Sequence, residues 1–122
     1  MGVFYVDCEI EGLRGERAAV TAPRLLPDSG SEFTWVPEAR LIGAGVTVAK
    51  RDLPFVMANG ETIHRSSGYA IVRAAGFETV DEVVFGQPGD LSLLGSRTLE
   101  GFGASVDARR RRLVASGPHI AA

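Results

Sequence analysis

Short runs of β-branched and aromatic residues recur along this chain, and turn-forming residues separate them roughly every 8–12 residues. The runs that fit strands lie at 3–10, 16–26, 33–36, 53–58, 61–67, 69–72, 79–85 and 113–115. Residues 38–41 suit at most a brief helical turn. Residues 97–102 favour a short helix, with Ser96 as its cap and Gly103 as its end. This pattern predicts an all-β, barrel-like fold with one short helix near the C-terminus.

Composition narrows the class of protein. The chain has 122 residues, 45% of them hydrophobic and 23% charged, and shows no internal repeat or linker. We therefore expect a single domain spanning residues 1–122. The net charge of −2 gives no reason to expect nucleic acid or membrane as a partner. No apolar stretch approaches the ~20 residues of a transmembrane helix. The first residues include an early acid and no basic leader, so we expect a cytoplasmic protein.

Few other residues carry a chemical signal. Cys8 is alone, which excludes an internal disulfide and predicts a small buried side chain. His64 and His119 lack metal-ligand spacing, so we expect surface positions and no metal site. Arginines 109–112 could form a basic patch, but alternation along a strand would divide them between two faces. The acidic pairs at 9/11 and 81/82 offer the two carboxylates that a glycosidase uses, but we expect them to face water.

The dipeptide Asn59-Gly60 follows an apolar run and suits a two-residue hairpin loop. Both central residues of a type I′ turn need positive φ, which Asn and Gly tolerate well. The sequence therefore predicts a hairpin with its tip at these two residues.

The tetrapeptide Asp28-Ser29-Gly30-Ser31 follows the apolar residues 25–26. Asp-Ser/Thr-Gly occurs by chance in roughly one chain in twenty of this length, and alone it is most simply a turn. Two further features make it more informative. A β-prone aromatic stretch follows at 33–37, and Leu93-Leu94-Gly95 precedes the expected helix.

With these two motifs, in this order, the chain resembles the retropepsin-like (clan AA) aspartic proteases, and in particular their small prokaryotic branch. The resemblance covers about residues 9–114, and the order of strands, turns, loop and helix in the second half carries most of it. It implies a closed β-barrel whose active site lies on a two-fold axis between two subunits.

The resemblance also implies roles for the first motif. Asp28 would be the catalytic carboxylate, and Ser29 would send its hydroxyl across the axis to the opposite loop. Gly30 would allow a close approach of the two loops. Ser31 would bond the outer carboxylate oxygen.

A second group of residues would support this loop and bind substrate. Leu93, Leu94 and Gly95 would brace the loop from behind, and Leu91 with Leu93 would face the cleft. The flap that closes over substrate would be formed by Ala58, Asn59 and Gly60.

What the resemblance implies for function is a homodimer that hydrolyses a peptide or protein substrate without metal or organic cofactor. Two carboxylates held about 3 Å apart share one proton, as is established for aspartic proteases. The ionised one would activate a water molecule while the other polarises the scissile carbonyl group.

One departure from the family pattern keeps other hypotheses open. Pro27 stands where the family usually has an aliphatic residue, and proline removes a backbone N–H. A catalytically impaired dimer of the same fold, acting as a peptide-binding or scaffold module, is the alternative that this residue suggests. A third hypothesis is an unrelated β-barrel, monomeric, in which Asp28 lies in an exposed turn.

Overall fold

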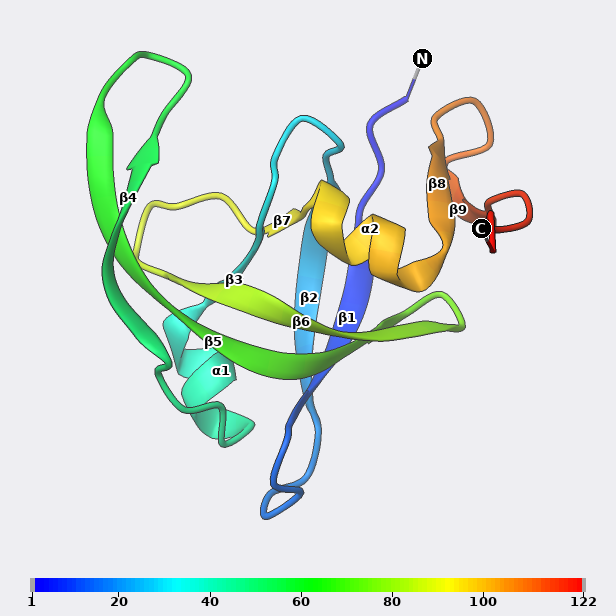
Figure 1. Ribbon diagram of the computed structural model, residues 1–122. Coiled ribbons are helices and arrows are strands. Elements are labelled where there is room, and N and C mark those ends of the chain that lie inside the picture. The colour runs from blue at the N-terminus through cyan, green and yellow to red at the C-terminus, as the bar shows by residue number, and fades with distance from the viewer. Residues whose placement is uncertain (1, 122) are drawn as a thin grey trace.

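The computed structural model describes residues 2–121, which form nine strands and two helices. Figure 1 shows their arrangement. In chain order they are β1 Val6–Gly12, β2 Val20–Pro27, β3 Thr34–Pro37, α1 Glu38–Gly43, β4 Lys50–Val56, β5 Thr62–Ala74, β6 Phe77–Gly86, β7 Leu93–Leu94, α2 Ser96–Phe102, β8 Ala104–Asp107 and β9 Arg112–Ala115.

The strand pairings form a ring. The main sheet has the order β1-β2-β7-β3-β6-β5-β4, and an additional pairing joins β1 to β5. Closure is possible because β5 is 13 residues long: its first part pairs with β4 and its later part with β1. Strand β4 therefore lies outside the ring, and the β4–β5 hairpin projects from the body (Figure 1). The prediction of an all-β fold is confirmed.

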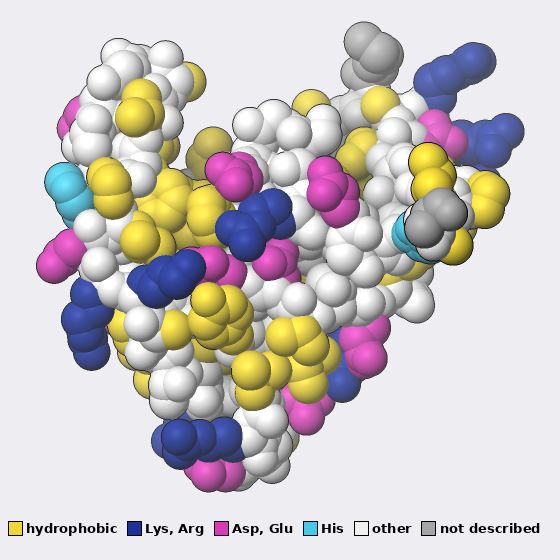
Figure 2. Space-filling view, in the orientation of Figure 1, with side chains coloured by type: hydrophobic (Ala, Val, Ile, Leu, Met, Phe, Trp, Pro, Cys, Tyr) yellow, Lys and Arg dark blue, Asp and Glu magenta, His cyan; other side chains and the backbone are white. Residues whose placement is uncertain are grey.

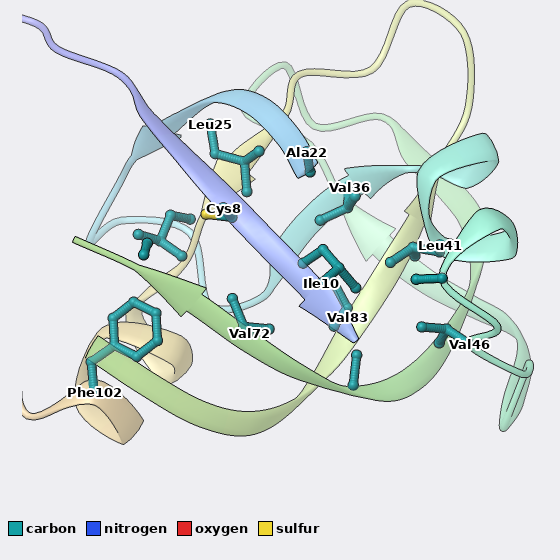
Figure 3. Packing of buried hydrophobic residues seen from close by; sticks show 14 of the residues in the cluster. Cys8, Ile10, Ala22, Leu25, Val36, Leu41, Val46, Val72, Val83 and Phe102 are labelled. Carbon is teal, nitrogen blue, oxygen red and sulfur yellow. The ribbon is translucent and has the colours of Figure 1, made fainter. Parts of the chain in front are cut away.

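The core fills this ring with alternate side chains from each strand. On β1, Cys8 and Ile10 point inward, as expected from the two-residue period of a strand. Figure 3 shows them packed with Leu25 and Val72 from the neighbouring strands β2 and β5 and with Val83 from β6. Cys8 is buried as predicted. Burial, with a smaller contribution from Asp7, raises the pKa of its thiol to about 12, so it is an inert thiol.

The tight turns differ in part from prediction. Asn59-Gly60 was expected to form a type I′ turn, but only Gly60 has a positive φ, of 84°. The Gly60 N–H instead donates to the Met57 carbonyl at 2.9 Å, which makes a longer loop. The conformation expected there is found at Ala75-Gly76, where φ is 51° and 86°. Local residue type predicted a turn at Asn59-Gly60, but the register of the flanking strands decided its form.

The helices also differ from prediction. Helix α1 at Glu38–Gly43 is a second, short helix that extends the brief turn expected there. Ser96 was expected to cap α2, but the helix begins at Ser96, its N-cap is Gly95, and no side chain caps it. Gly103 ends the helix as predicted, with a left-handed φ of 68°.

Charged residues show one clear correction. Glu82 was expected to face water, but it is buried at 3% exposure because its carboxylate has partners inside the fold. Ser67 Oγ donates to it at 2.6 Å and Lys50 Nζ at 3.1 Å. Burial alone would raise the pKa of Glu82, but these hydrogen bonds and the nearby cations outweigh it and lower the pKa.

The remaining surface predictions mostly hold. His64 and His119 are exposed, and residues 109–112 are exposed as well. Only Arg112 lies in a strand, because the other three arginines form the turn between β8 and β9, so alternation along a strand does not apply to them. Neither helix of residues 2–121 is long and apolar enough to cross a membrane.

The core makes a first prediction. Ile10→Ala should lower the free energy of unfolding by about 2–5 kcal/mol, because a fully buried side chain leaves a cavity between β2 and β5. Val80→Ala, at a position that is 58% exposed, should change it by about 0.5 kcal/mol or less. Urea unfolding of both variants tests this, and equal effects would contradict the assignment of the core.

Candidate active site

A cleft of about 560 Å³ lies between the β4–β5 hairpin and the loop that joins β2 to β3. In Figure 2, hydrophobic side chains gather beside the lobe that this hairpin forms. The residues that line the cleft are Asp28, Gly30, Ser31, Glu32, Phe33, Trp35, Pro54, Phe55, Val56, Met57, Ala58, Asp90, Leu91 and Leu93.

Asp28 lies at the floor of this cleft, directly after β2. Strand β2 pairs in parallel with the short β7, so the Asp28 N–H donates to the Leu94 carbonyl at 2.9 Å. The Asp28 carboxylate accepts the Gly30 N–H at 2.9 Å, and its carbonyl accepts the Ser31 N–H at 3.1 Å. These bonds wind residues 28–31 into a tight turn that holds a half-buried carboxylate in a fixed position.

Gly95 packs directly against the back of this turn, at a position where no side chain would fit. A Cβ atom at Gly95 would lie 2.4 Å from the carbonyl carbon and oxygen of Phe33. The adjacent Ser96 N–H donates to the Ser31 carbonyl at 2.7 Å, and the Arg97 N–H to the Glu32 carbonyl at 3.1 Å. The start of α2 therefore closes directly onto the loop that carries Asp28.

A buried chain of hydroxyl groups extends this support. The Gly95 N–H donates to Thr34 Oγ1 at 2.9 Å, which lies 2.6 Å from Thr98 Oγ1. Thr98 in turn donates to Asp81 Oδ2 at 2.8 Å. Since that bond uses the only hydroxyl proton of Thr98, Thr34 must donate to Thr98. Every group in the chain is then satisfied, although no local sequence signal pointed to it.

Aromatic side chains form one wall of the cleft. Phe55 of β4 contacts Phe33 and Trp35 edge-on, with ring centroids 5.4 and 5.0 Å apart. The guanidinium group of Arg97 lies 4.7 Å from the centroid of the Phe33 ring. These aromatic residues join the core at one side and present apolar surface to the cleft at the other.

The predicted site residues divide into three groups. Asp28, Gly30, Ser31, Ala58, Leu91 and Leu93 line the cleft together. Leu94 and Gly95 are buried behind the loop, while Ser29, Asn59 and Gly60 are exposed outside the cleft lining. The Ser31 hydroxyl donates to the Phe33 carbonyl at 2.9 Å rather than to the Asp28 carboxylate.

Pro27 fits the loop without loss of a ladder bond. On the side facing β7, the N–H groups of Leu26 and Asp28 are the donors, to Ser92 and Leu94. A backbone N–H at position 27 would point to the opposite edge, where the β1 pairing of β2 reaches only Leu25. The missing donor therefore weakens no hydrogen bond of the β2–β7 pair.

Sequence reasoning missed an ion pair at the edge of the cleft. Arg65 of β5 binds Asp90 through two hydrogen bonds, Nε to Oδ2 at 2.7 Å and Nη2 to Oδ1 at 2.8 Å. The hydrogen bond from Arg65 holds the pKa of Asp90 below its usual range. The residues stand 25 positions apart, so only a known contact between β5 and the 87–92 loop could have revealed them.

A second hollow among the described residues offers less reactive chemistry. This hollow, of about 540 Å³, is lined by residues that include Cys8, Arg73 and Glu78. Its Arg73 side chain is already paired with Glu9, Glu11 and Glu78. Nowhere within residues 2–121 do three or more His, Cys, Asp or Glu side chains group as a metal site would require.

Comparison with known proteins supports the fold. The chain is similar to the solution structure of the simian foamy virus (mac) protease, with a TM-score of 0.50 and 23% sequence identity. The match covers 79% of this chain and 91% of that one. No protein-family model and no curated protein matches the chain. The structural likeness supports a retropepsin-like fold for this protein.

The close packing of Gly95 against Phe33 leads to a second prediction. Gly95→Ala should lower the free energy of unfolding by about 1–3 kcal/mol or more, because its methyl group would overlap the Phe33 carbonyl. Gly117→Ala is the matched control, since nothing lies within 4 Å of a Cβ atom there. Thermal and urea unfolding of the two variants would measure the difference, and a harmless Gly95→Ala would contradict the close contact.

The ion pair makes a third prediction. A carboxylate whose pKa is lowered by folding stabilises the folded state above its unfolded pKa, and this stabilisation is lost as the pH falls through the folded value. Asp90→Asn should therefore destabilise the protein at pH 7, and the deficit should shrink in acid below the usual Asp range. Unfolding curves from pH 7 to pH 2 test this. A deficit independent of pH would show that charge is not its cause.

Proposed function

We propose that this protein is a homodimeric aspartic endopeptidase in which each subunit contributes Asp28 to one catalytic dyad. The observation that carries the proposal is the position of Asp28: a half-buried carboxylate in a hydrogen-bonded turn, at the floor of a cleft beneath a projecting hairpin. The retropepsin-like fold supports it, since the likeness to a viral protease covers most of the chain.

The need for a second copy follows from the chemistry. The reaction needs two adjacent carboxylates that share a proton. Two other acids line the described cleft. Asp90 is held by Arg65, and Glu32 has an exposed side chain with no hydrogen bond in the described structure that would hold it against Asp28. We therefore assign the second carboxylate of the dyad to Asp28 of a second copy of this chain. The exposed Ser29 hydroxyl and the Pro27 carbonyl at the loop base are suited to join the two loops.

In such a dyad the shared proton and the remaining negative charge belong to the pair. The ionised carboxylate takes a proton from a bound water molecule, and the protonated one polarises the scissile carbonyl group. Its apparent pKa values describe both Asp28 side chains together. The β4–β5 hairpin, closing over the substrate, would exclude bulk water and strengthen these interactions.

The walls of the cleft suit an extended peptide. The free edge of β4 borders the cleft, and the aromatic and aliphatic side chains at Phe33, Phe55, Leu91 and Leu93 offer apolar contacts. The fit of Pro27 into the β2–β7 pair favours a working enzyme over an impaired scaffold of the same fold. The reaction needs no metal or organic cofactor.

The fourth prediction tests this function. Asp28→Asn should lower cleavage of a peptide library by about 10²–10⁴-fold or more, because it removes the group that moves the proton. The matched control is Asp107→Asn, outside the cleft at the end of β8, because Asn keeps the Oδ1 acceptor for the Arg110 N–H. Mass spectrometry of the products and sedimentation of both variants would measure activity and assembly.

Two results would contradict the proposal. One is cleavage that persists in Asp28→Asn. The other is a protein that cleaves peptides yet remains a monomer at every concentration tested, since a monomer has one Asp28. Pro27→Val separates the impaired alternative: we expect little change in activity, whereas a large gain would show that the proline impairs catalysis.

A further inference from the structure

The Arg65–Asp90 pair joins two walls of the cleft that are remote in sequence. Arg65 lies on the inner face of the hairpin, opposite Leu53 of β4, and Asp90 ends the turn at residues 87–90. Both side chains are largely shielded, with 19% and 13% exposure. The Gln87 N–H also donates to Asp90 Oδ2 at 2.8 Å. Three donors therefore hold this carboxylate, and two of them come from the hairpin.

Below this pair, the foot of the hairpin is firmly anchored. Lys50 of β4 and Ser67 of β5 both bind the buried Glu82 of β6. Between Lys50 and Leu53 the register shifts, because two residues of β4 oppose one residue of β5. Asp52 in this bulge has a left-handed φ of 54°. A bulge bends a strand locally, so the outer hairpin has a hinge just above its anchor.

Beyond the bulge, few contacts position the outer hairpin. The backbone bonds at its tip, from Met57 to Glu61 at 2.8 Å and from Gly60 to Met57 at 2.9 Å, are internal. So are the side-chain bonds of Asn59 in the described structure. Among the interactions of the described residues, the aromatic contacts of the Phe55 ring and the ion pair of Arg65 join the outer hairpin to the body of the protein. The ion pair is the directional contact of the two.

Asp90 is followed directly by residues 92–94, whose carbonyl groups hold the end of β2 and the loop that carries Asp28. The Ser92 carbonyl accepts the Leu26 N–H at 3.0 Å, and the Leu94 carbonyl accepts that of Asp28 at 2.9 Å. Leu91, 71% exposed, projects into the cleft between these points. The segment 90–94 therefore binds the hairpin through Asp90 at one end and supports Asp28 through Leu94 at the other.

We propose that the Arg65–Asp90 pair is a latch that holds the β4–β5 hairpin in position over the cleft, with the bulge at Asp52 as its hinge. This rests on the proposed protease function for its consequence in catalysis. Arg65 and Asp90 are positioning residues: they hold the hairpin over the substrate and touch no reacting atom.

Amide hydrogen exchange tests the latch without any need for cleavage. In Asp90→Asn and Arg65→Gln, the Met57 and Gly60 amides should exchange about tenfold faster or more, because local unfolding of the outer hairpin no longer has to break a charged bidentate contact. Arg65→Lys, which keeps the charge but loses the fork geometry, should give an intermediate rate. Amides of β1 exchange through global unfolding, so in the same samples they report the loss of global stability that Asp90→Asn also causes.

Arg73→Gln is the matched control, because Arg73 lies on the same strand and pairs with three carboxylates away from the cleft. It should leave the hairpin amides unchanged. Hairpin exchange that does not respond to Asp90→Asn, or that responds equally to Arg73→Gln, overturns the latch.

Kinetics separate the latch from the proposed function. In an active enzyme, Asp90→Asn should raise KM for a peptide by about tenfold with a much smaller change in kcat, since the hairpin holds substrate and the dyad is intact. Faster hairpin exchange in a protein that cleaves nothing overturns the protease and keeps the latch. Unchanged exchange and KM in a protein whose activity depends on Asp28 overturns the latch and keeps the protease.

Discussion

The close contact of Gly95 with the Phe33 carbonyl is the constraint on which the candidate site depends. It lets the start of α2 lie directly against the loop after β2, so that Ser96 and Arg97 can bind its carbonyl groups. The parallel pair of β2 and β7 then holds the Asp28 backbone from the other side. A loop fixed in this way keeps a carboxylate in one geometry, which a dyad shared between two subunits requires.

Strand β6 supports both halves of the cleft through two adjacent acids. Because neighbouring residues of a strand point to opposite faces, Asp81 and Glu82 serve different partners. Asp81 ends the hydroxyl chain that begins at Gly95, and Glu82 anchors the foot of the hairpin through Ser67. The loop that carries Asp28 and the foot of the hairpin are thus both bound to the same strand, β6.

The sequence predicted what depends on neighbours along the chain. Alternating apolar residues predicted the strands, and Gly103 predicted the end of α2. The candidate site could be located as well, because Asp28-Ser29-Gly30 and Leu93-Leu94-Gly95 are each contiguous. The burial of Glu82 could not be predicted, since nothing adjacent to it shows that Ser67 and Lys50 will satisfy its charge.

The sequence by itself therefore determined an all-β chain, its turns, and the tight loop that carries Asp28. Tertiary structure decided that the ring closes through β1 and β5, and that β4 remains outside it as a projecting hairpin. It also decided that Arg65 meets Asp90. The physical reason is range: turns and strand periods arise from local backbone preferences, whereas ion pairs and closure depend on which distant segments the folded core brings together.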